Sequence, residues 1–169
     1  MAYTEDDLNL LSTVPQLIGS AAGSGLFGTG KELFANANAI LDGLKSYPGN
    51  ALIKQLLPDP KEDRAAAVEK MRKTRDWAMA RLKAKGIDNA EKLRAQTLED
   101  ARAAASILGA KASAAEAEEY RQWTLSIAEK VANAATEGGF LGLGGVQVTP
   151  AEKSLILDIR KALGASAAV

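Results

Sequence analysis

Four helix-start signals divide the chain, and they constrain its fold more than any other feature of the sequence. Each places a capping side chain three residues before an acidic one, which is the spacing of a capping box. They are Thr4 with Asp7, Asp59 with Glu62, Ser113 with Glu116, and Thr149 with Glu152. The only strand-like run, residues 145–148, is too short to form a sheet. The chain is therefore predicted to be all-α.

About seven helices are expected. They lie at residues 5–22, 31–46, 51–57, 60–85, 89–108, 114–136 and 150–163. Pro15 lies inside the first helix and should kink or split it. A further start signal at Thr97 and Asp100 leaves open whether residues 89–108 form one helix or two.

The fourth expected helix has a clear end and a clear apolar stripe. Gly86 should stop this helix in the left-handed conformation, with Ile87 as its hydrophobic partner. Its outer face is dense in Lys and Arg, which indicates a solvated surface. Its buried face is expected to contain Val68, Met71, Ala78 and Leu82.

The length of 169 residues suits one domain, residues 1–169, folded as one compact bundle. Residues 8–45 and 122–163 also resemble each other. Each has a Leu-Ser pair three residues after its start (Leu11-Ser12 and Leu125-Ser126), then an Ala-Ala pair and a glycine-rich segment, and continues into another helix. These two stretches are predicted pseudo-repeats that would form two pseudo-symmetric helical halves, although an echo this short could also arise by chance.

Composition removes several classes of function. The chain has no Cys and no His, so thiolate chemistry, imidazole acid–base catalysis and Ser-His-Asp sites are excluded. Its 21 basic and 21 acidic side chains leave no basic excess for binding nucleic acid. No apolar run approaches the ~18 residues of a spanning helix, and the acidic N-terminus does not resemble a signal peptide. A cytoplasmic, non-enzymatic protein is expected, with an enzyme that uses only carboxylates as the least favoured reading.

A glycine-rich apolar segment occurs twice, as G-apolar-apolar-G-x-G, and is the predicted site of ligand or partner contact. The residues are Gly25, Leu26, Phe27, Gly28 and Gly30 in the first segment, and Gly139, Phe140, Leu141, Gly142 and Gly144 in the second. The first segment also spells G-x-G-x-x-G and G-x-x-x-x-G-K, but a helix precedes it where both nucleotide motifs need a strand. Glu32 stands where a phosphate-binding loop needs Ser or Thr.

Two interpretations of these segments remain open. The glycines could allow positive φ at helix ends, with the paired apolar residues plugging the core beneath. The segments could instead be lids over an apolar groove, or insert into a partner or a membrane edge. Glu137 and Glu152, with the Thr149 hydroxyl, could form an oxygen site for Ca²⁺ or Mg²⁺. Because capping already accounts for Thr149 and Glu152, no cofactor is expected, and the metal is kept as an alternative.

In the C-terminal part of the chain, an Ala-rich helix at residues 127–135 is followed by Gly138 and by the helix start at residues 148–153. This pattern resembles that of the tellurite-resistance TerB-like family. The resemblance covers about 35 residues. It implies an all-helical domain built from two related halves, an acidic metal or ligand site at the turn, and a role in stress-linked complexes. The family's Asp-Gly turn is replaced here by Glu137 and Gly138, so only Glu137 and Glu152 carry over as site residues.

The sequence thus predicts a non-enzymatic helical binding or scaffold protein of TerB-like character, associated with tellurite stress resistance. Its ligand, metal or protein partner would contact the two glycine-rich segments. The alternative is a carrier that holds a hydrophobic small molecule or lipid in an apolar cavity between helices. A homodimer and a peripheral membrane contact stay open, and nucleic acid is not an expected partner.

Overall fold

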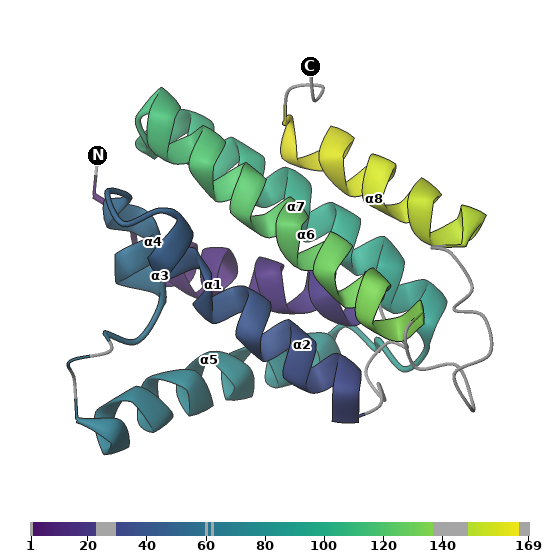
Figure 1. The fold of residues 1–169 in the computed structure, drawn as a ribbon, viewed down its shortest axis with the longest axis horizontal. Helices are drawn as coiled ribbons and strands as arrows, with labels where there is room; N and C mark the ends of the chain where they lie inside the picture. The colour runs from purple at the N-terminus through teal and green to yellow at the C-terminus, as the bar shows by residue number, and fades with distance from the viewer. Residues whose placement is uncertain (1, 23–29, 60, 62, 137–148, 166–169) are drawn as a thin grey trace.

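Every regular element that the structure describes is a helix, which confirms the all-α prediction (Figure 1). The structure is a computed structural model, and it describes residues 2–22, 30–59, 61, 63–136 and 149–165. Within these ranges the helices are α1 (Glu5–Ala22), α2 (Gly30–Leu41), α3 (Gly43–Ser46), α4 (Ala51–Leu56), α5 (Arg64–Ala84), α6 (Ala90–Lys111), α7 (Ala114–Thr136) and α8 (Pro150–Leu163). Each helix in the described part of the chain is too short or too polar to span a bilayer.

Three of the four predicted capping boxes are present. The Thr4, Ser113 and Thr149 hydroxyls each accept a hydrogen bond from the backbone N–H three residues on, at 3.2 Å. The partner carboxylates accept in return from the cap residue's own N–H. The signal at Asp59 was wrong, because the Asp59 carboxylate accepts from the Lys61 N–H two residues on and closes a local turn. α5 begins later, at Arg64.

Two expected helix boundaries also differ. Pro15 is buried inside α1 and does not split it. The helix expected at 31–46 is instead divided into α2 and α3 at Asp42. At this division the indole Nε1 of Trp123 donates to the Ile40 carbonyl at 3.1 Å. A tertiary hydrogen bond therefore occupies a carbonyl that a continuous helix would use in its own ladder.

The end of α5 and the continuity of α6 have local explanations. Gly86 has φ of 66°, and the Ile87 N–H donates to the Leu82 carbonyl, as predicted for the end of α5. α6 is a single helix, which is one of the two alternatives that the sequence left open at Thr97 and Asp100. The Thr97 hydroxyl donates to a carbonyl one turn back, and Asp100 is committed to a partner on α5.

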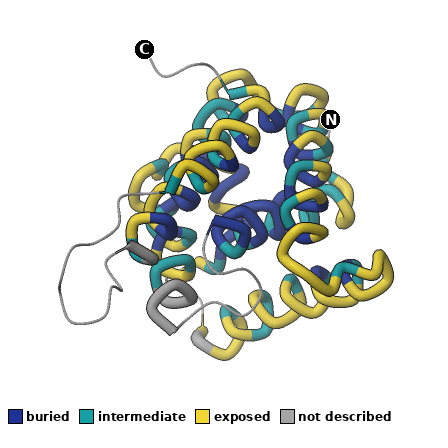
Figure 2. Tube along the Cα trace, turned by 90° about the vertical axis from the view of Figure 1, so that its right-hand side faces the viewer, coloured by how far each residue is buried: buried dark blue, intermediate teal, exposed yellow. Residues whose placement is uncertain are grey.

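The main core lies between α1, α6 and α7, with α2 against α7 and α8 against both α6 and α7. Buried residues gather along the inner faces of these helices (Figure 2). Among the described residues, Tyr120 and Trp123 are the two largest fully buried side chains, and their rings pack edge to face with centroids 5.6 Å apart. The Tyr120 hydroxyl donates to the Leu11 carbonyl at 2.8 Å, which ties α7 to α1.

α5 stands apart from the rest of the bundle and packs mainly against α1, along the lower edge of Figure 1. In its C-terminal half the two predicted core residues are buried, with Ala78 covered and Leu82 in a small cluster with Leu17 and Leu93. Its N-terminal half differs from the prediction, since Val68 is 57% and Met71 50% exposed. The apolar stripe of α5 therefore continues past the point where the core ends.

An ion pair between Asp7 and Lys111 joins the first turn of α1 to the last turn of α6, and it should make stability depend on pH. The Lys111 ammonium, with the Thr4 amide and hydroxyl, lowers the pKa of Asp7 from 3.8 to about 2. A lowered folded-state pKa stabilises the fold above the unfolded-state pKa of ~3.9, and the stabilisation is lost as pH falls toward 2. We expect the urea midpoint to fall across this window in the wild type.

The D7N variant should show a smaller fall in urea midpoint across the same window, because it carries no titrating carboxylate at this position. D6N is the matched control, since it removes the exposed neighbouring carboxylate and should leave the pH dependence as in the wild type. If D7N and the wild type lose the same stability between pH 4 and pH 2, the ion pair does not contribute.

Candidate functional site

Most of the predicted contact residues lie outside the described part of the chain. This holds for Gly25, Leu26, Phe27 and Gly28, for Gly139, Phe140, Leu141, Gly142 and Gly144, and for Glu137. Gly30 is the first residue of α2. The role of the two glycine-rich segments therefore stays a prediction.

Glu152 is engaged as a helix cap. Its Oε2 accepts from the Thr149 N–H at 2.7 Å and from the Thr149 hydroxyl at 2.9 Å, at the start of α8. Among the described residues no three acidic side chains are close enough together to hold a metal ion. With Glu137 outside the described residues, the alternative metal site at these two glutamates stays a prediction.

The feature that the structure adds is a groove of about 570 Å³ between α1, α2, the end of α4 and the first half of α5. The described residues that line it are Ser12, Gln16 and Ser20 on α1, Asn36, Ala37, Ile40 and Leu41 on α2, Leu56, Leu57 and Pro58 at the end of α4, Val68, Lys70, Met71, Arg72, Thr74 and Arg75 on α5, and Trp123 on α7. Trp123 is 1% exposed and forms the base.

The wall formed by α1 and α2 carries the two amide side chains of the groove, Gln16 and Asn36. Asn36 donates from Nδ2 to the Gln16 carbonyl at 3.3 Å, and its buried Oδ1 has no hydrogen-bond partner among the described residues. Asn36 fits here because Gly19 faces it, and a Cβ at position 19 would lie 2.0 Å from that Oδ1. The glycine thus lets α1 and α2 approach closely while an amide is kept at the groove.

The opposite wall is α5, which is fastened near both of its ends. Near its start, the Lys70 ammonium donates to the Gln55 and Leu57 carbonyls at the end of α4, at 2.9 Å each. These carbonyls have no partner within the α4 ladder, so a cation there is favourable. Near its end, Arg81 makes two hydrogen bonds to the buried Asp100 carboxylate of α6. Between these two attachments, the residues of α5 that line the groove are Met71, Arg72, Thr74 and Arg75.

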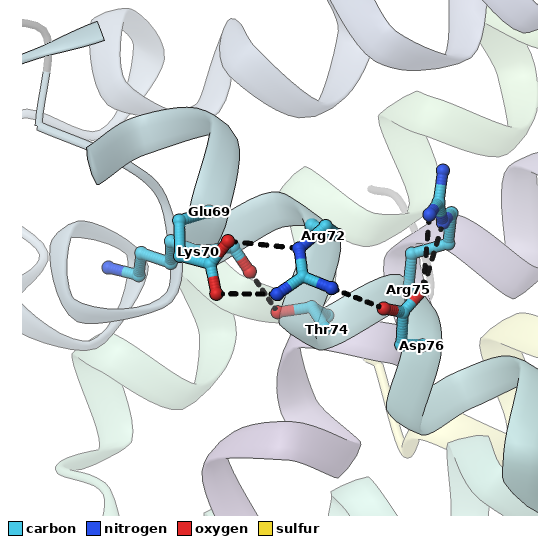
Figure 3. A network of polar contacts seen from close by, with 6 residues as sticks. All are labelled: Glu69, Lys70, Arg72, Thr74, Arg75 and Asp76. Carbon is cyan, nitrogen blue, oxygen red and sulfur yellow. Dashed lines mark hydrogen bonds and ion pairs between the residues drawn. The ribbon is translucent and has the colours of Figure 1, made fainter. Parts of the chain in front are cut away.

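Cations line the α5 wall and carboxylates do not. Arg72 donates to Glu69 at 2.8 and 2.9 Å and to Asp76 at 3.3 Å, and Arg75 donates to the same Asp76 at 3.1 Å. Figure 3 shows this network along one side of α5. The hydrogen bonds from Arg72 lower the pKa of Glu69 and raise that of Arg72. Of the described residues that line the groove, three are cationic and none is acidic.

The sequence did not predict the groove, but its periodicity identified the apolar stripe that includes two of the lining residues. Val68 and Met71 were recognised as an apolar stripe of α5 and assigned to the core, whereas they face the groove. The side chains here are hydroxyls, amides, cations and apolar groups, which suit binding. No carboxylate is available among the described lining residues to act as a base or a metal ligand.

Comparison with protein-family models, with curated proteins and with solved structures gave no significant match. The resemblance to the TerB-like family therefore stays a prediction, and the groove is interpreted from its own geometry.

Proposed function

We propose that this protein is a non-catalytic binding protein that carries a hydrophobic small molecule in the groove between α1, α2 and α5. The observation that supports the proposal is the groove itself. Its volume of about 570 Å³ lies within the ~300–1,000 Å³ of ligand pockets, which combine apolar walls with a few placed polar groups. The expected contact thus moves from the glycine-rich segments to the space between α1, α2 and α5.

Exposed apolar side chains at the mouth of the groove provide surface that a bound ligand would bury. Val68, Met71 and Leu41 are exposed at 57%, 50% and 39%, and all three line the groove. Covering apolar surface is worth roughly 25 cal/mol per Å². A ligand that lies between α2 and α5 would remove this surface from water and would also contact Trp123 at the base.

The neutral apolar fluorophore N-phenyl-1-naphthylamine tests the proposal directly. We expect it to bind the wild type at one site, with a blue-shifted emission. Trp77 and Trp123 are the two tryptophans. In a W77F background, Trp123 is the sole indole, and its emission should be quenched as the probe binds. Quenching would show that the probe binds within energy-transfer distance of Trp123, and the α5 variants described next test whether it binds in the groove.

Two exposed methionines of α5 make a matched pair of variants. Met71 is 50% and Met79 52% exposed, but of the two only Met71 lines the groove. M71E should weaken probe binding by about tenfold or more, because it introduces a charge where the ligand would be desolvated. M79E should bind as the wild type does. Absence of probe binding to the wild type, or equal losses in M71E and M79E, would refute the proposed function.

A further inference from the structure

We propose that the ligand is a single-chain anionic amphiphile, such as a medium- or long-chain carboxylate, with its head group at Arg75 and its chain toward Trp123. This inference rests on the proposed function, and it assigns the chemical class of the molecule that the groove takes. It is carried by the charge of the α5 wall and by the hydrogen-bond commitments of its three cations.

The cationic residues of the groove all come from one stretch of α5. Lys70, Arg72 and Arg75 line the space. Residues 69–76 hold four basic side chains and two acidic ones, Glu69 and Asp76, and neither acidic residue lines the groove. The mouth of the groove therefore carries an excess of positive charge, which favours an anion and disfavours a cation.

Two of these three cations are already committed. The Lys70 ammonium is bound to the Gln55 and Leu57 carbonyls of the α4 end. The Arg72 guanidinium makes two hydrogen bonds to Glu69 and a third to Asp76. Both cations therefore act mainly within the protein, one as a fastening of α5 and the other as part of the surface network.

Arg75 is the cation that can take a ligand. It bonds only Asp76 among the described residues, through Nε at 3.3 Å and one terminal nitrogen at 3.1 Å, both to the same oxygen. Asp76 is shared with Arg72, so its single charge is divided between two guanidinium groups (Figure 3). The Arg75 side chain is 67% exposed. Its guanidinium fork matches a carboxylate, which accepts two N–H groups at once.

The rest of the groove suits an alkyl chain. Eight of the 17 described lining residues are apolar side chains of α2, the end of α4 and α5, and the buried indole of Trp123 closes the base. A chain that enters at the mouth would leave its charged head in partial contact with water. This arrangement avoids the cost of desolvating an ion inside the groove.

Three probes with the same twelve-carbon chain test the inference: dodecanoate, dodecan-1-ol and dodecylamine. Each displaces bound N-phenyl-1-naphthylamine in a titration below its aggregation concentration. For the wild type at low salt we expect dodecanoate to bind about tenfold more tightly than dodecan-1-ol, which corresponds to ~1.4 kcal/mol. Dodecylamine should bind more weakly than the alcohol.

The variant R75Q should lose the preference for dodecanoate over dodecan-1-ol and keep its affinity for the alcohol. K73Q is the matched control, because it removes one positive charge from the same helix at an exposed position that does not line the groove. K73Q should retain most of the preference.

The outcomes separate this inference from the proposed function. Equal affinity of the wild type for dodecanoate and dodecan-1-ol, or an undiminished preference in R75Q, overturns the assignment of an anionic ligand while the groove remains a binding site. If none of the three probes displaces the fluorophore, and the fluorophore itself does not quench Trp123, the proposed function fails as well.

Discussion

The variant D100N is expected to lower the free energy of unfolding by about 3 kcal/mol, which is the usual effect of breaking a buried ion pair on one side. Asp100 is 1% exposed, and its two oxygens accept from Arg81 at 2.5 and 2.6 Å and from Gln96 at 2.7 Å. An asparagine at this position would lose the negative charge and would turn an N–H group toward one of these donors. Arg81 would keep its charge in a mostly buried position without a counter-ion.

Urea unfolding followed by circular dichroism measures the loss of unfolding free energy in D100N. Two further variants test whether the loss comes from the broken ion pair. E99Q changes the neighbouring exposed carboxylate, which lies 3.4 Å from Lys85, and should cost less than ~1 kcal/mol. The double variant R81M/D100N should be ~1–2 kcal/mol more stable than D100N, because the unpaired cation is gone. A cost for D100N no larger than that of E99Q would show that this pair does not hold α5 in place.

A second large effect is expected at Gly43, where G43A should destabilise the fold by about 2 kcal/mol through overpacking. A Cβ at position 43 would lie 2.5 Å from Nε1 and 2.8 Å from Cε2 of Trp123. The indole cannot move freely, since it is buried, packs edge to face on Tyr120 and donates to the Ile40 carbonyl. G43A should therefore also weaken binding of the fluorophore, because the indole forms the base of the groove.

The matched control for G43A is G109A. Gly109 is also helical, but nothing lies within 4 Å of a Cβ built there, so alanine should stabilise α6 by up to ~1 kcal/mol. W123F removes the indole atoms that the new methyl group would meet. In a W123F background G43A should cost less than ~1 kcal/mol, as expected for coupled neighbours. An unchanged cost in that background would show that the indole is not the obstacle.

Local signals in the sequence were sufficient for most of the helices. Capping pairs such as Thr149 with Glu152, and the stop at Gly86, work through contacts within a few residues. Two differences from the expected helices occurred where a distant residue intervenes. Trp123 divides the helix expected at 31–46, and Asp100, whose spacing from Thr97 resembled a helix start, is the counter-ion of Arg81. Neither contact has a local signature.

The groove could not be predicted for a related reason. Periodicity showed that Val68 and Leu82 share one stripe of α5, but it did not show where α5 leaves the body of the protein. That point depends on the attachment of Lys70 to the end of α4 and on the close approach of α1 and α2 at Gly19. The glycine-rich segments drew the functional prediction because their composition is unusual, and their role is still a prediction.

The base and the α5 wall of the groove differ in how freely they can change during evolution. The Trp123 indole donates to the Ile40 carbonyl where α2 ends and packs closely against Gly43 of α3. A substitution at the base of the groove therefore disturbs the core. Val68, Met71 and Arg75 are exposed, and exposed positions usually tolerate substitution at little cost in stability. Selection on ligand choice would thus act mainly on α5. A new ligand preference could then arise there without a compensating change elsewhere in the chain.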